Sequence, residues 1–93
     1  MQEASSHQSD PLKRARLRWR ARRGLLENDL VITRFLDKHE YDLTDEDVGA
    51  LTALLEEPDN ELLDLILARK EPEPAGPLDQ PAVRRVLDRL RTA

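Results

Sequence analysis

Apolar side chains recur three and four positions apart through most of the chain, and charged residues fill the positions between them. This spacing places the apolar side chains on one face of an α-helix, and capping and turn residues separate the segments that show it. We therefore predict an all-α fold, a small five-helix bundle. The predicted helices lie near residues 11–23, 26–39, 45–56, 60–69 and 80–92.

The first predicted helix starts at Asp10 and Pro11, an N-cap residue followed by proline at the first helical position. Leu12, Ala15 and Trp19 then recur at helical spacing and form its apolar face. The alternating arginines of this segment would also suit a strand with one charged face. No hairpin partner of comparable pattern follows, so the pattern favours the helix.

Gly24 is placed to end the first helix, because glycine readily adopts the left-handed conformation that closes many helices. The second helix then carries a continuous apolar stripe: Leu26, Leu30, Val31, Phe35 and Leu36. Thr44 and Asp47 resemble a capping box at the start of the third helix, with Asp in place of the usual Glu.

The fourth helix is densely apolar, so we expect most of its circumference to be covered and the helix to lie at the centre of the bundle. Its apolar residues are Leu62, Leu63, Leu65, Ile66 and Leu67. Four of the six prolines then lie in the segment from Lys70 to Pro81, which favours an extended linker. A fifth amphipathic helix follows, and the sequence leaves open whether it packs on the other four.

These elements predict three parts of the chain. Residues 1–10 are expected to be a disordered N-terminus. Residues 11–70 form a four-helix core with a partner-docking face, and residues 71–93 form the proline-rich linker and the C-terminal helix.

Charge is distributed unevenly along the chain. The net charge is −4, yet residues 1–26 carry seven basic and two acidic groups, whereas residues 27–93 carry eight basic and seventeen acidic groups. The basic end supports one alternative, a small nucleic-acid-binding helical protein that uses the Arg-rich first helix. The acidic remainder, the single interleaved aromatic residue and the lack of a DNA- or RNA-binding signature argue against it.

Several classes of function are disfavoured by the composition. The chain has no cysteine, and its two histidines, His7 and His39, share no helix face, so neither a metal site nor a nucleophile–base pair is expected. The three glycines lie far apart, which excludes a phosphate-binding loop. We predict that the chain is not an enzyme. The acidic N-terminus and the absence of a long apolar run indicate neither a secretion signal nor membrane insertion, which leaves the cytoplasm as the expected location.

The most informative segment is Arg23-Gly24-Leu25-Leu26-Glu27, at the end of the arginine tract. A guanidinium and a carboxylate on either side of a helix-ending glycine would project near one bend and bind a partner. The alternative is a solvated Arg23–Glu27 salt bridge, worth about 0–1 kcal/mol. Trp19, one helical turn earlier, either anchors an interface or packs its ring on the bundle.

A wider pattern surrounds this segment. It comprises Arg16, Trp19, the run Arg22-Arg23-Gly24-Leu25-Leu26-Glu27-Asn28-Asp29 and Phe35, followed by a Leu-Leu-Glu-x-x-Asp-x-x-Leu register at residues 54–62. The pattern resembles the FAD assembly factor family of succinate dehydrogenase over roughly residues 14–70, and its most specific element is Arg-Gly-x-x-Glu. Leu25 stands where the family commonly has Met, and Leu65 where it usually has Trp; both changes keep apolar character.

The resemblance implies a helical assembly factor that binds the flavoprotein subunit of succinate dehydrogenase, or of the related fumarate reductase, and promotes its covalent flavinylation. The partner-binding residues would be Arg16, Trp19, Arg22, Arg23, Gly24, Glu27 and Asp29. The FAD would be carried by the partner, so this chain itself would bind no cofactor. We expect a monomer that binds no nucleic acid, in the cytoplasm of a bacterium or, in a eukaryote, the mitochondrial matrix.

Overall fold

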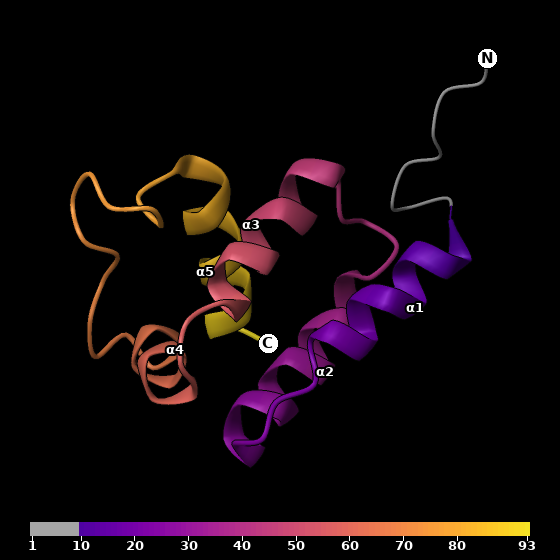
Figure 1. The fold of residues 1–93 in the computed structure, drawn as a ribbon, viewed down its shortest axis with the longest axis horizontal. Coiled ribbons are helices and arrows are strands. Elements are labelled where there is room, and N and C mark those ends of the chain that lie inside the picture. Colours follow the sequence, from indigo (N-terminus) through magenta and orange to yellow (C-terminus); the bar gives the residue numbers. More distant parts are fainter. Residues whose placement is uncertain (1–9) are drawn as a thin grey trace.

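The computed structural model describes residues 10–93, and within them the chain forms helices and loops but no strand. Five helices follow one another (Figure 1): α1 Pro11–Arg20, α2 Leu26–His39, α3 Asp45–Leu55, α4 Asp59–Ile66 and α5 Pro81–Arg91. The prediction of an all-α protein with five helices is confirmed. The predicted disorder of residues 1–10 falls, apart from Asp10, outside the described residues.

The predicted starts of α1 and α3 are confirmed by their caps. The Asp10 carboxylate accepts hydrogen bonds from the backbone N–H groups of Leu12 and Lys13, at 2.9 and 3.3 Å. Thr44 and Asp47 form a complete capping box, in which each side chain accepts from the other residue's backbone N–H. These contacts satisfy backbone donors that have no partner inside a helix.

α1 ends at Arg20, earlier than the predicted end at Arg23, and Gly24 does not terminate it. The helix closes at Ala21, whose N–H donates to the Leu17 carbonyl at 2.9 Å. No glycine within the described chain has a positive φ, so none forms a left-handed cap. The Arg23 side chain instead donates to the Arg20 carbonyl at 2.9 Å, which satisfies the helix end without glycine.

α4 also ends earlier than predicted, at Ile66. Ala68 takes the left-handed conformation with φ 60°, and the Arg69 N–H donates back to the Asp64 carbonyl at 2.8 Å. This is a Schellman closure with alanine in the position that glycine usually occupies. The sequence did not predict this end because alanine normally continues a helix.

The hydrophobic core centres on α5, which corrects the expectation that α4 lies at the centre. α5 makes its most extensive contact with α3 and also packs against α2 and α4 (Figure 1). Its buried residues are Ala82, Val83, Val86, Leu87 and Leu90. α4 buries Leu62, Leu65 and Ile66, but Leu63 is only partly buried and Asn60 is exposed, so one side of this helix faces solvent.

The proline-rich segment before α5 is anchored to the core by Leu78, and Pro72 in the same segment is also buried. The question that the sequence left open is therefore answered: the last helix packs within the same core as the other helices.

The apolar faces of α1 and α2 differ from those that the spacing predicted. Leu12, Trp19 and Leu26 are 57%, 77% and 65% exposed. Leu17 and Ala21 are buried on the α1 side instead, and Ile32 is buried in α2. α1 lies along α2 (Figure 1) and makes none of the extensive helix contacts of the core. Across the described residues, no helix is both long and apolar enough to cross a membrane.

Candidate partner-docking face

The corner between α1 and α2 is held by the guanidinium of Arg23. Its three nitrogens donate to the carbonyls of Arg20, Arg22 and Leu55, at 2.9, 2.8 and 2.9 Å. Arg20 and Leu55 are the last residues of α1 and α3, so one side chain satisfies carbonyls at two helix ends. Arg23 is therefore not the freely projecting cation that the sequence suggested, because its donors are engaged within the chain.

The start of α4 braces the same corner. The Asp59 carboxylate accepts from the Leu25 N–H at 3.3 Å, and the Asn28 side-chain amide donates to the Asp59 carbonyl at 2.8 Å. Asn28 is fully buried, and its side-chain oxygen has no hydrogen-bond partner among the described residues. The register at residues 54–62 thus supports the Arg-Gly-x-x-Glu segment in space. Asn28 belongs to the pattern that resembles the family, but the sequence reasoning did not count it among the site residues, although it is a polar residue at helical spacing from the apolar Ile32 and Phe35.

Asp29 fixes the corner from the first turn of α2. Its carboxylate accepts from the Arg23 N–H at 3.1 Å and lies 3.5 Å from the Arg22 guanidinium. Arg22 is largely exposed, whereas Asp29 is mostly covered. Of these two predicted site residues, Arg22 is accessible to a partner and Asp29 chiefly holds the loop.

Gly24 and Glu27 face solvent on this corner. A Cβ atom at Gly24 would meet its nearest neighbour, an Asp59 carboxylate oxygen, at 3.8 Å, which is ordinary van der Waals contact. The fold itself therefore does not require glycine here. Glu27 forms no ion pair with any described residue, including Arg23, and its position in the first turn of α2 is favoured by the helix dipole by about 0.3–1 kcal/mol.

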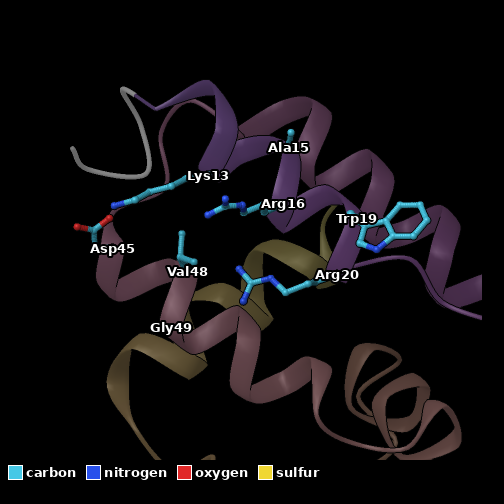
Figure 2. Close-up of a pocket in the computed structure, with 8 residues that line it drawn as sticks. All are labelled: Lys13, Ala15, Arg16, Trp19, Arg20, Asp45, Val48 and Gly49. Carbon is cyan, nitrogen blue, oxygen red and sulfur yellow. The ribbon is translucent and has the colours of Figure 1, made fainter. Parts of the chain in front are cut away.

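Trp19 and Arg16 lie beside this corner on the exposed side of α1. Trp19 borders two open grooves. One, of about 570 Å³, runs between α1 and α2 and is also lined by Arg22 and Asp29. The other, of about 750 Å³, runs between α1 and α3 and includes Arg16 (Figure 2); we call it the α1–α3 groove. The ring is not packed into the bundle, which leaves it available as an interface anchor.

α1 is held on α2 by charge. Arg18 donates to Glu40 at 2.9 and 3.1 Å and to Asp37 at 2.9 Å. The hydrogen bonds that Arg18 donates to the Glu40 carboxylate, with a further contribution from Asp37, raise the pKa of the Arg18 guanidinium. Arg14 lies 4.6 Å from the centre of the Tyr41 ring, a cation–π contact between α1 and the end of α2. Some arginines of the tract are therefore engaged in contacts within the molecule.

The seven predicted site residues therefore fall into two groups. Arg16, Trp19, Arg22, Gly24 and Glu27 are exposed, whereas Arg23 and Asp29 are partly covered and bonded within the chain. Within the described residues there is no cluster of three His, Cys, Asp or Glu that could hold a metal ion. The arrangement offers a recognition surface with one fixed corner and one exposed aromatic ring.

The family described as flavinator of succinate dehydrogenase matches residues 15–93, which is most of the chain. The chain belongs to this family. A protein named FAD assembly factor SdhE from Ralstonia nicotianae is 67% identical over 86 residues, covering 92% of this chain and 88% of that relative.

More distant members of the family align over shorter stretches. One with the same name from Coxiella burnetii is 35% identical over 65 residues, covering 70% of this chain and 79% of the relative. The mitochondrial succinate dehydrogenase assembly factor 2 of Meyerozyma guilliermondii is 46% identical over 48 residues, covering 50% and 36%. No solved structure matches the chain. The resemblance recognised in the sequence is confirmed at the level of the family.

Proposed function

We propose that this protein binds the flavoprotein subunit of succinate dehydrogenase, or of the related fumarate reductase, and promotes covalent attachment of FAD to it. The observation that carries the proposal is membership of the flavinator family, with a relative named FAD assembly factor that is 67% identical over nearly the whole chain. The chain acts as an assembly factor, not as an enzyme. It carries no flavin itself, because the FAD belongs to the partner.

The chemistry of flavin attachment then takes place in the partner. A covalent bond to the flavin requires the attacking side chain to be aimed correctly and the charge that develops on the ring to be stabilised. An assembly factor that binds one arrangement of the partner's domains more tightly than the others shifts the population toward that arrangement. Exposed recognition residues on a fixed corner suit this role.

Different residues of the docking face have different parts in this proposal. Trp19, Gly24 and Glu27 contact the partner, because they are exposed and the fold does not require them. Arg23 and Asp29 give the corner its shape through their bonds within the chain. Arg16 and Arg22 add exposed cations beside the ring, at the ends of the same surface.

The alternative of a nucleic-acid-binding helix is less well supported by the geometry. Arg18 and Arg23 are bonded inside the molecule, and Arg22 lies beside Asp29, so the tract does not present one continuous cationic stripe. In this proposal the protein is a monomer that neither binds nucleic acid nor inserts into a membrane. It works in the cytoplasm of a bacterium, or in the mitochondrial matrix of a eukaryote.

Substitutions at the corner test the proposal. The flavoprotein is expressed in cells whose only assembly factor is this chain, carrying Glu27→Ala or Gly24→Arg, and covalent flavin is read as fluorescence that survives denaturing electrophoresis. Both variants should keep their helical circular dichroism, since Glu27 is exposed and position 24 accepts a Cβ without strain. Both should abolish covalent flavin.

Arg34→Gln serves as the matched control, because Arg34 is an exposed residue of α2 away from the corner. It should flavinylate the partner like the unaltered chain. Normal flavin attachment with Glu27→Ala or Gly24→Arg would contradict the docking assignment.

A further inference from the structure

The α1–α3 groove has features that the fixed corner does not explain. Its α1 wall carries Arg16 and Arg20, and its α3 wall carries Val48 and Gly49, with Asp45 at one end. Figure 2 shows the Arg16 and Arg20 side chains extending from α1 toward α3, while the Trp19 ring points away from them. The groove is open, with a volume of about 750 Å³.

The two arginines of this groove differ from their neighbours on α1. Arg18 is paired with Glu40 and Asp37, and Arg22 lies beside Asp29. Arg16 and Arg20 have no such partner anywhere in the described chain, and both are exposed. Cations that the fold leaves unpaired, on the side of the helix that borders a groove, are available to an anionic ligand.

Gly49 supplies an independent observation on the opposite wall. It lies in the interior of α3, where glycine is less favourable than any residue except proline. A Cβ atom built at Gly49 would meet nothing within 4 Å, so packing within the chain does not demand glycine. Because glycine has no side chain, another backbone can approach α3 closely at this point of the groove.

We propose that the α1–α3 groove binds an extended, acidic segment of the flavoprotein partner, with carboxylates at alternate positions. Residues four apart on a helix are separated by about 6 Å along its axis. Side chains two apart on an extended chain are separated by about 6.5 Å on one side. One such segment therefore places two carboxylates opposite Arg16 and Arg20 while its backbone runs over Gly49.

A peptide segment suits this groove better than a polynucleotide. Asp45 stands at one end of the groove, where a polyphosphate chain that continued past the arginines would meet a carboxylate. Val48 gives the groove an apolar side that suits a peptide. The groove is also continuous with the proposed docking face through Trp19 and Arg16, so a single partner can cover both surfaces.

The inference rests on the proposed function, and Gly49→Leu tests the groove by itself. Leucine favours helix over glycine, and a Cβ atom at this position meets nothing within 4 Å, so the variant should melt at or above the temperature of the unaltered chain. Its affinity for the purified flavoprotein, measured by isothermal titration calorimetry, should fall at least about tenfold because the side chain fills the groove. Gly49→Ala adds only one methyl group, so its affinity for the flavoprotein should lie between those of the unaltered chain and Gly49→Leu.

Neutralising the cations tests the chemistry of the ligand. Arg16→Gln combined with Arg20→Gln should weaken binding about tenfold at low salt and make the affinity less sensitive to salt. The control is Arg34→Gln, which should bind like the unaltered chain. Arg34 is exposed on α2 and forms no ion pair with the described residues. A photo-crosslinking residue at position 49 should capture a partner peptide with acidic residues at alternate positions.

The outcomes separate this inference from the proposed function. If Gly49→Leu and the double variant bind normally while Glu27→Ala does not, the groove is not a docking site and the proposed function stands. If the unaltered chain fails to bind the flavoprotein, the proposed function is wrong, and so is the inference that rests on it. Binding of a polynucleotide, or formation of a dimer in sedimentation, that is lost in the double variant would assign the groove to that ligand and overturn the inference.

Discussion

α5 and α1 are both amphipathic helices, but they use their apolar residues in opposite ways. α5 turns Val83, Val86 and Leu90 into the core, where they are almost completely buried. α1 buries Leu17 and leaves Leu12 and Trp19 in solvent. Because burial of apolar surface is the main favourable term in folding, α5 contributes far more to stability than α1 does. The exposed apolar side chains of α1 are left for another molecule.

The contacts that hold these two helices in place also differ in their balance of apolar packing and polar bonds. α5 is held chiefly by apolar packing on α3, α2 and α4, to which Arg85 and Arg89 add ion pairs with Glu46 and Asp47 at the start of α3. α1 is held largely by polar contacts, with Arg18 bonded to Glu40 and Asp37 on α2. Salt screens exposed ion pairs and leaves apolar burial intact, so the position of α1 depends more on ionic strength than the core does.

The same substitution in the two helices should give the largest contrast. Leu90→Ala removes a side chain that is 1% exposed, and should lower the free energy of unfolding by about 2–5 kcal/mol. Leu12→Ala removes one that is 57% exposed, and should lower it by less than about 0.5 kcal/mol. Urea unfolding followed by circular dichroism measures both. Equal losses from the two variants would show that α1 belongs to the core as much as α5 does.

Local signals in the sequence predicted the helices well. The range of α2 was predicted correctly, and Thr44 and Asp47 gave the start of α3, because caps are set by residues a few positions apart. The spacing of Leu12 and Trp19 also predicted a helix correctly. It could not show that this face lies outside the core, because a docking face and a core face have the same periodicity.

Long-range contacts explain the rest of what the sequence did not show. The central place of α5 depends on packing against three other helices, which no local pattern encodes. At the candidate site, the exposed carboxylate of Glu27 was expected, and it is exposed. The bond from Arg23 to the Leu55 carbonyl joins residues that are far apart in the chain, so the structural task of Arg23 could not be predicted.

Substitution of two adjacent arginines, one bonded within the fold and one exposed, should give a smaller contrast at the corner where α1 meets the rest of the fold. Arg23→Ala leaves the carbonyls of Arg20 and Leu55 without their donor, and should lower the free energy of unfolding by about 1–2 kcal/mol. Arg22→Ala removes only a long, exposed contact with Asp29, and should change it by less than about 0.5 kcal/mol. The midpoints of urea unfolding measure the difference. If Arg22→Ala proved the more damaging change, the assignment of Arg23 as the brace would be wrong.

The smallest expected effect concerns His39, at the end of α2, where the ring lies 5.2 Å from that of Phe35. Burial, with the nearby charges of Arg89 and Lys38, lowers the pKa of His39 below its ordinary value of 6.5, although Asp42 acts in the opposite direction. The unfolded chain therefore binds a proton more readily than the folded chain does. The stability contributed by neutral His39 is complete above pH 6.5 and declines as the pH falls through 6.5 toward the lower folded value.

Unfolding free energies at pH 7.5 and 5.5 should thus differ slightly more for the unaltered chain than for His39→Gln. The glutamine variant keeps a polar side chain that does not titrate, so subtracting its pH dependence removes the contribution of the carboxylates, which both proteins share. A steeper pH dependence in His39→Gln would mean that the charged imidazolium is stabilised at this helix end. The C-terminal dipole of α2 would then outweigh burial beside Phe35.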